Sequence, residues 1–81
     1  MTMLEDALDH LVRGIVAHPD DVEVAARMLR RGRVLEVRVH PSDLGKVIGR
    51  SGRTASALRT VVGALAGGRA VRVDFLDVDE R

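Results

Sequence analysis

The most informative part of the sequence is a glycine-rich and basic stretch, Gly45-Lys46-Val47-Ile48-Gly49-Arg50-Ser51-Gly52-Arg53. Because glycine has no Cβ, two glycines separated by two residues allow a tight turn that another backbone can approach closely. The amides of such a turn, and the N-terminus of a helix after it, offer N–H donors and partial positive charge to phosphate oxygens. Arg50 and Arg53 can grip a phosphate bidentately, and Lys46 adds a point charge. The stretch therefore suits a sugar-phosphate backbone.

Two common nucleotide-binding glycine motifs do not fit this stretch. The pattern GxxxxGK[ST] is absent, because Gly45-Lys46 is followed by Val47 and no glycine lies at the required upstream position. The pattern GxGxxG is absent as well, since the glycines are spaced GxxxGxxG. A bare GxxG is more often a simple corner between two helices with solvated arginines, because glycine marks turns freely. The surrounding sequence has to decide between a phosphate-binding turn and a simple helix corner.

The residues before the stretch predict a strand and a short helix. Apolar side chains alternate with polar ones over residues 34–40, at Leu35, Val37 and Val39. This pattern predicts a half-buried strand, which Pro41 closes. Ser42 and Asp43 then predict an N-cap and a first-turn acid for a helix over residues 44–48.

A longer helix and a last strand are predicted after the stretch. The helix carries one apolar stripe, formed by Ala55, Leu58, Val61, Val62 and Leu65. Gly67-Gly68 supplies its C-terminal end. Residues 71–76 alternate between apolar and polar side chains and predict a strand.

The N-terminal third predicts a helix followed by an ambiguous segment. Apolar residues recur at helical spacing from Leu4 to Val16, and Thr2 with Glu5 forms a capping-box signature. Residues 18–21 end this helix, because the residue before a proline disfavours the α region. Residues 22–31 alternate as a strand would, yet they also suit a helix capped by an aspartate and ended by a glycine. If they form a strand, residues 31–33 serve as a hairpin turn.

Composition limits the class of protein. The chain has 81 residues, which predicts one small domain, and a domain of this size is marginal enough that a partner chain is expected. Cysteine is absent, which indicates a reducing cytoplasm. No apolar run approaches the ~20 residues of a membrane span, and the acidic N-terminus does not resemble a secretory signal. Phe75 is the only aromatic residue, which excludes modules that stack bases on aromatic platforms, such as RRM or cold-shock folds.

Charge is distributed unevenly along the chain. Residues 1–26 contain one basic and six acidic residues, whereas residues 27–59 contain nine basic and two acidic ones. This asymmetry is compatible with a basic face that attracts phosphates, and equally with charges that pair across the fold. The acidic side of the first helix, with Glu5, Asp6 and Asp9, is expected to lie away from the phosphate-binding turn or to meet a partner protein.

In this context the stretch resembles the KH domain family, whose hallmark Val-Ile-Gly-x-x-Gly between two helices is matched by residues 47–52. The chain, most strongly over residues 35–62, is similar to the small bacterial KH proteins of the KhpA family. The resemblance implies an α+β, two-layer type II KH domain with the order α-β-β-α-α-β and a three-stranded sheet with helices on one face. Together with the residue patterns it leads us to expect one domain over residues 1–81, with a helix over 1–17, the other elements over 22–76 and a frayed acidic tail over 77–81. It also makes residues 22–28 a strand.

The resemblance implies a function and its residues. In KH domains the GxxG loop clamps the backbone of about four nucleotides, and the bases lie over an apolar groove. Carried onto this chain, the clamp consists of Gly49, Arg50, Ser51 and Gly52, flanked by Lys46 and Arg53. The groove would be formed by Val47 or Ile48 with Val37 or Val39, although Ile48 suits core packing equally well. The implied function is non-catalytic binding of single-stranded RNA, as an RNA chaperone or post-transcriptional regulator, with a second copy or a larger KhpB-type protein as partner.

Two other classes of function are considered beside RNA binding. A protein-interaction module would use the GxxG turn only structurally and dock an acidic partner on the basic face. An enzyme would need a catalytic constellation, but no serine lies in a nucleophile elbow and cysteine is absent. The histidines are far apart and lack partners at metal spacing, so neither a metal nor another cofactor is predicted. His40 is expected to support the start of the following helix or to add a weak RNA contact.

Overall fold

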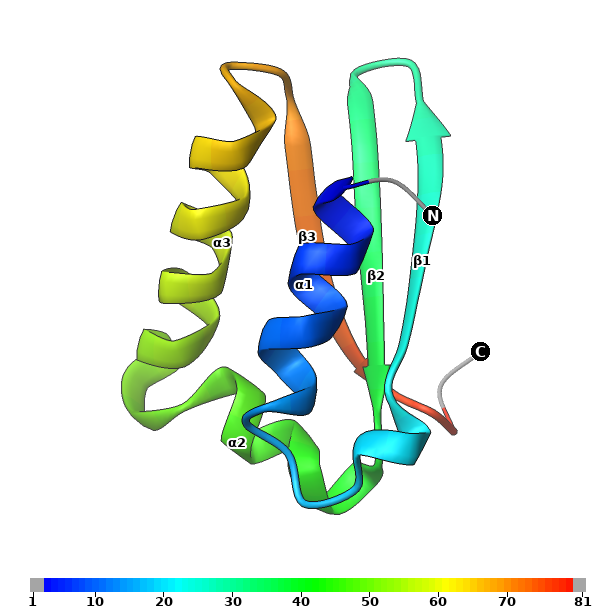
Figure 1. Ribbon diagram of the computed structural model, residues 1–81, viewed down its shortest axis with the longest axis vertical. Helices are drawn as coiled ribbons and strands as arrows, with labels where there is room; N and C mark the ends of the chain where they lie inside the picture. The colour runs from blue at the N-terminus through cyan, green and yellow to red at the C-terminus, as the bar shows by residue number, and fades with distance from the viewer. Residues whose placement is uncertain (1–2, 80–81) are drawn as a thin grey trace.

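The computed structural model describes residues 3–79, in which helices and strands follow the order α-β-β-α-α-β (Figure 1). The elements are α1 (Met3–Arg13), β1 (Glu23–Leu29), β2 (Gly32–Val39), α2 (Leu44–Ile48), α3 (Arg53–Ala66) and β3 (Val71–Asp77). Short 3₁₀ turns lie between them at Pro19–Asp21, Pro41–Asp43 and Arg50–Gly52. The order is the one that the resemblance implies.

The sheet has three strands with β2 in the middle. β2 is antiparallel to β1 and parallel to β3, and Val37 stands opposite Val24 on one side and Phe75 on the other. The three helices lie on one face of this sheet (Figure 1). None of the helices within residues 3–79 is long and apolar enough to cross a membrane. The two-layer α+β architecture predicted from the resemblance is therefore confirmed.

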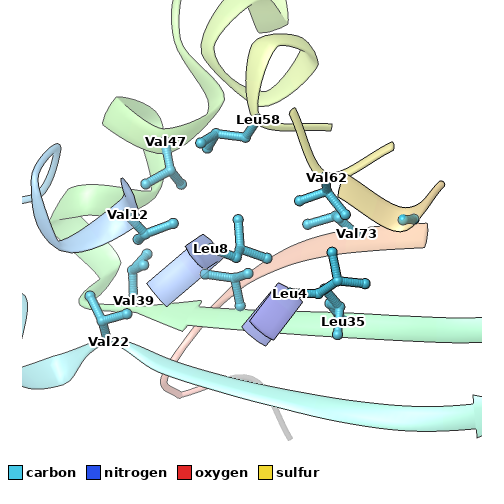
Figure 2. Close-up of a cluster of buried hydrophobic side chains, with 12 residues drawn as sticks. Leu4, Leu8, Val12, Val22, Leu35, Val39, Val47, Leu58, Val62 and Val73 are labelled. Atoms are coloured by element: carbon cyan, nitrogen blue, oxygen red, sulfur yellow. The ribbon is translucent and has the colours of Figure 1, made fainter. Parts of the chain in front are cut away.

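The core lies between the sheet and the helices (Figure 2). Because successive strand residues point to opposite faces, Leu35, Val37 and Val39 of β2 all enter the core, and none has exposed surface. Leu8 and Val12 of α1 are also fully buried and face them. Each such side chain contributes about 1.5–3 kcal/mol through burial. The core thus joins the N-terminal helix to the middle strand.

The β1–β2 hairpin resolves the ambiguity of residues 22–31 in favour of a strand. Its turn is Arg30-Arg31, slightly earlier than expected, and Gly32 already belongs to β2. Gly32 has a φ of 134°, and a Cβ there would lie 2.5 Å from the carbonyl oxygen of Ala70. Glycine is required because the start of β3 passes directly beside it, and the Arg33 N–H donates to the same Ala70 oxygen at 3.0 Å.

The first helix is shorter than its apolar periodicity predicts. α1 ends at Arg13, and the Ile15 N–H donates to Val12 O at 3.0 Å, a tightened i→i−3 bond. The chain leaves the helix here because the backbone N–H groups of Ala17 and His18 donate to the side chain of Asp43, the residue just before α2. The predicted capping residue Thr2 lies outside the described residues.

The apolar stripe predicted for α3 is only partly buried. Its buried side chains are Ala55, Leu58, Val62 and Ala66. Val61 and Leu65, which the sequence predicts in the stripe, are 41% and 45% exposed. α3 lies at one side of the helix layer, so that only the stripe facing α1 and the sheet is covered (Figure 1).

The acidic C-terminal segment is more ordered than expected as far as the structure describes it. β3 continues through Asp77, which is paired with Val39. The Val78 N–H then donates to Val39 O at 2.8 Å. The sheet therefore holds the chain through Val78, and the prediction of fraying from residue 77 was wrong for Asp77 and Val78.

Candidate nucleic-acid interface

The GxxG loop has a backbone conformation that most residues avoid. Gly49, Ser51 and Gly52 have φ values of 78°, 54° and 74°. Ser51 is the one non-glycine residue with positive φ in the described part of the chain. The turn is closed by the Gly52 N–H, which donates to Gly49 O at 3.1 Å. This left-handed backbone brings the chain from α2 into α3 within four residues.

The two glycines of the loop are required for different reasons. A Cβ on Gly49 would lie 2.8 Å from the Cβ and the backbone nitrogen of Thr54, and would also collide with the Thr54 hydroxyl. A Cβ on Gly52 would meet nothing within 4 Å. Gly49 therefore permits α3 to pack against the end of α2, whereas Gly52 supplies only its left-handed conformation and keeps the surface above it open.

Donors and cations converge around the loop. α3 begins at Arg53, and its N-cap, Gly52, provides no side-chain hydrogen bond to the first turn. The Arg53 N–H donates to Arg50 O, whereas the N-cap offers no side chain to the N–H groups that follow, at the positive end of the helix dipole. Arg50, Arg53 and Lys46 are exposed around them. Neither Arg50 nor Arg53 has an ion-pair partner among residues 3–79, so both guanidinium groups are open to an anion.

A buried carboxylate anchors the segment that leads into the loop. Asp43 is fully buried and accepts the Ala17 N–H at 3.1 Å, the His18 N–H at 2.9 Å and a 2.9 Å contact from His18 Nδ1. Burial by itself raises the pKa of Asp43, but the hydrogen bonds from His18 and Ala17 outweigh it and lower the pKa to about 2. The Lys46 ammonium lies 3.6 Å from the same carboxylate. Asp43 thus ties the α1–β1 connection to α2.

Two histidines complete this anchor. The rings of His18 and His40 stack with centroids 4.0 Å apart. His40 Nδ1 accepts the Ser42 N–H at 3.1 Å, which confirms that His40 supports the start of the turn before α2. The prediction that Ser42 is the N-cap and Asp43 a first-turn acid of α2 was wrong, because Ser42 lies in the 3₁₀ turn and Asp43 is itself the N-cap, with a buried side chain that makes no cap hydrogen bond. Sequence reasoning missed the anchor because its partners lie 25 residues apart and follow no motif.

The residues predicted to line the groove differ in how deeply they are buried. Val37, Val39 and Val47 have no exposed surface, because β2 and α2 turn these side chains into the core. The expectation that these three valines contact bases directly was therefore wrong, because their side chains lie beneath the protein surface. Ile48, at the end of α2, is half-buried and keeps surface next to the loop.

The arginines of the hairpin do not extend the basic surface of the loop. In Figure 1 the β1–β2 turn and the α2–α3 loop lie at opposite ends of the long axis, which measures 32 Å.

The acidic side of α1 exposes less free negative charge than its sequence suggests, since Glu5 is buried and Asp9 pairs with Arg13 at 3.0 Å. Within residues 3–79 no group of three or more His, Cys, Asp or Glu could hold a metal ion.

The element order, the mixed three-stranded sheet and the GxxG loop between α2 and α3 together define a type II KH domain. The family model described as "KhpA/KhpB, KH domain" matches residues 5–76, and this chain belongs to that family. It is a non-catalytic family, so the chain is a binding domain and no enzyme.

Three named relatives are similar in sequence to nearly the whole of this chain. "RNA-binding protein KhpA" of Streptomyces coelicolor is 79% identical over 77 residues, which cover 95% of this chain and 96% of the relative. The protein of the same name from Leifsonia xyli is 69% identical over 75 residues, covering 93% and 99%. That of Mycobacterium tuberculosis is 64% identical over 75 residues, covering 93% and 92%.

Proposed function

We propose that this chain binds single-stranded RNA without catalysis and grips the phosphate backbone with Gly49, Arg50, Ser51 and Gly52. The observation that carries the proposal is the left-handed loop, which lies at the N-terminus of α3 beside two arginines that have no ion-pair partner among residues 3–79. Neutral amides and guanidinium groups together suit a phosphodiester, because they supply both directional donors and charge. The name of the relatives, RNA-binding protein KhpA, supports the same nucleic acid.

The flanking residues receive separate roles in this proposal. Lys46 and Arg53 bind phosphates next to the clamp, and Ile48 offers the apolar surface on which a base rests. Val37, Val39 and Val47 act indirectly, since they hold β2 and α2 in position from within the core. Backbone contacts carry little sequence information, so we propose a modest sequence preference and a general role as an RNA chaperone or post-transcriptional regulator in the cytoplasm.

We further propose that two KH units act together, either two copies of this chain or this chain with a larger KhpB-type protein. The exposed side chains of Val61 and Leu65 lie one turn apart on α3 and support a chain-to-chain contact through that face. Two weak clamps on one strand gain about a hundredfold in affinity when both engage. Sedimentation of wild type and of Val61→Asp/Leu65→Asp tests this: a persistent dimer in the variant would contradict a contact through α3.

The clamp is tested by titrating a labelled single-stranded RNA with wild type and with Arg50→Asp/Ser51→Asp, at low and moderate salt. The matched control is Arg31→Asp/Thr60→Asp, which makes the same change in net charge at exposed positions away from the loop. Circular dichroism establishes that all three proteins are folded. We expect salt-sensitive binding in wild type and control, and loss of at least about tenfold in the loop variant. Equal binding by all three, or binding by none across several RNAs, would contradict the clamp.

A further inference from the structure

The end of the molecule opposite the GxxG loop carries a second basic surface, which the proposed RNA clamp does not use. The β1–β2 turn and the start of β3 enclose two shallow hollows of about 390 and 310 Å³. Together we call them the hairpin-end surface. Gly32, Arg33, Ala70 and Val71 line both hollows, so the two form one continuous feature around the close approach of β2 to β3.

The charge of the hairpin-end surface is of one sign. No acidic residue lines either hollow, whereas five arginines do, namely Arg30, Arg31, Arg33, Arg69 and Arg72. Some of these have partners within the chain: Arg72 pairs with Asp74 at 3.1 Å and Arg69 donates to Ala66 O at 3.1 Å. Arg30 and Arg31, at the exposed turn itself, have none among the described residues. The surface therefore attracts a negatively charged ligand.

The same surface exposes apolar side chains. Met28 and Leu29, just before the turn, are 72% and 44% exposed, and each lines one of the hollows. Val34 and Val71 add further apolar lining. Exposed apolar side chains within a basic rim are typical of surfaces that bind other proteins, because such a contact removes apolar area from water while charges at the rim pair.

These features favour a protein partner over a second stretch of RNA. Arg30 and Arg31, which form the hairpin turn, do not have the positive φ that Ser51 has in the GxxG loop. The hairpin-end surface also has no aromatic side chain on which a base could stack, since Phe75 does not line either hollow. Methionine and leucine side chains gain nothing from a phosphate, but they complement apolar side chains of a peptide.

We infer that the hairpin-end surface binds a segment of another protein in which acidic and apolar side chains are interspersed. Carboxylates of the segment pair with the guanidinium groups of Arg30 and Arg31, in the bidentate geometry that arginine favours. Its apolar side chains enter the hollows beside Met28 and Leu29. Because this surface and the loop lie at opposite ends of the molecule, the chain can hold the partner while the loop stays available (Figure 1).

The inference is tested with a short labelled synthetic peptide in which Glu and Leu alternate, titrated by fluorescence anisotropy. Two control peptides replace Leu by Ser, which removes the apolar groups, or Glu by Lys, which reverses the charge. We expect wild type to bind the first peptide at least about tenfold more tightly than either control. Failure of the Glu/Leu peptide to bind, or equal binding of the Glu/Ser peptide, would overturn the inference, because the surface would then be inert or merely basic.

Two charge-matched variants locate the binding. Arg30→Glu/Arg31→Glu alters the hairpin end and Arg50→Glu/Arg53→Glu alters the loop, with the same change in net charge. We expect the hairpin variant to lose peptide affinity by about tenfold or more and to keep RNA affinity, and the loop variant to do the opposite. Equal loss of peptide by both variants would show a net-charge effect and overturn the inference. Loss of RNA by the hairpin variant would assign this end to RNA instead.

A milder change separates the apolar contribution from folding. Met28→Ser removes an exposed side chain and leaves the core intact, so its Tm should stay within about 2 °C of wild type. We expect it to weaken the Glu/Leu peptide severalfold and to leave the Glu/Ser peptide unchanged. Unchanged affinity for the Glu/Leu peptide would contradict a role for the apolar hollow.

Discussion

The two ends of the molecule both carry exposed arginines, but they hold them in different ways. At the loop end, Arg50 and Arg53 lie on a left-handed turn that is fastened to the core by Val47 and to the α1–β1 connection by Asp43. At the hairpin end, Arg30 and Arg31 lie on a two-residue turn of ordinary backbone. The difference teaches that arginine content alone does not identify a phosphate clamp. A preorganised backbone with open donors has to accompany it.

The largest effect is expected from removing the anchor of the loop end. Asp43→Ala takes away the acceptor of three hydrogen-bonding groups, among them the part-buried N–H groups of Ala17 and His18. We expect Tm to fall by on the order of 10 °C in a domain of this size. The control is Asp74→Ala on β3, whose ion pair with Arg72 is exposed and should shift Tm by less than about 2 °C. Similar losses in both variants would contradict the role of Asp43.

The same anchor predicts how stability depends on pH. The pKa of Asp43 is about 2 in the folded protein and near its ordinary value of 3.8 when unfolded, so the unfolded chain binds a proton first on acidification. Asp43 therefore stabilises the fold fully above pH 4, and this contribution is lost as pH falls from about 4 to about 2. The difference in Tm between wild type and Asp43→Asn, measured from pH 6 to pH 2, should shrink over this range. A constant difference would contradict the assignment.

The two glycines of the loop should respond unequally to alanine. Gly49→Ala adds a Cβ 2.8 Å from the Thr54 backbone nitrogen in addition to the cost of positive φ, and we expect about 2–3 kcal/mol of destabilisation with loss of RNA binding. Gly52→Ala meets no neighbouring atom, so it should cost only about 1 kcal/mol, from its φ of 74°. Chemical denaturation measures both. Equal free energies of unfolding for the two variants would show that Thr54 moves aside freely.

The salt dependence of RNA binding distinguishes the arginines of the two ends. If Arg50 contacts a phosphate, Arg50→Ala should reduce the slope of log affinity against log salt by about 0.7 and weaken binding about three- to tenfold. Arg31→Ala removes the same charge from the hairpin end and should leave the slope unchanged. A change of slope in Arg31→Ala of the same size would mean that RNA reaches both ends of the molecule.

The smallest effect is expected at Ser51. Ser51→Gly removes the cost of a left-handed non-glycine residue but adds flexibility to the unfolded chain, with a net stabilisation of about 0.5 kcal/mol. Arg31→Gly at the hairpin turn has no such strain to relieve, because its φ is not positive, and should destabilise slightly. Denaturant midpoints for the two variants test this difference. A loss of stability in Ser51→Gly would show that the turn is held without strain.

The elements from residue 34 onward and the position of the GxxG turn could be read from the sequence because they depend on local patterns. Alternation over residues 34–40, helical spacing after residue 53 and glycines at 49 and 52 are properties of neighbouring residues. Local patterns failed at two kinds of position. They could not choose between strand and helix for residues 22–31, and they could not tell which side of α3 would be covered, so Val61 and Leu65 were assigned to the buried stripe.

The sequence by itself determined the elements from residue 34 onward, the basic GxxG turn and the absence of aromatic platforms for bases. Only the tertiary structure decided that Val37, Val39 and Val47 lie in the core, that Asp43 binds residues far away in the chain, and that the β1–β2 turn lies at the opposite end of the molecule from the loop. The physical reason is that backbone preference and amphipathic period act between near neighbours. Burial, and the satisfaction of a buried carboxylate, depend on which distant segments the packed core brings together.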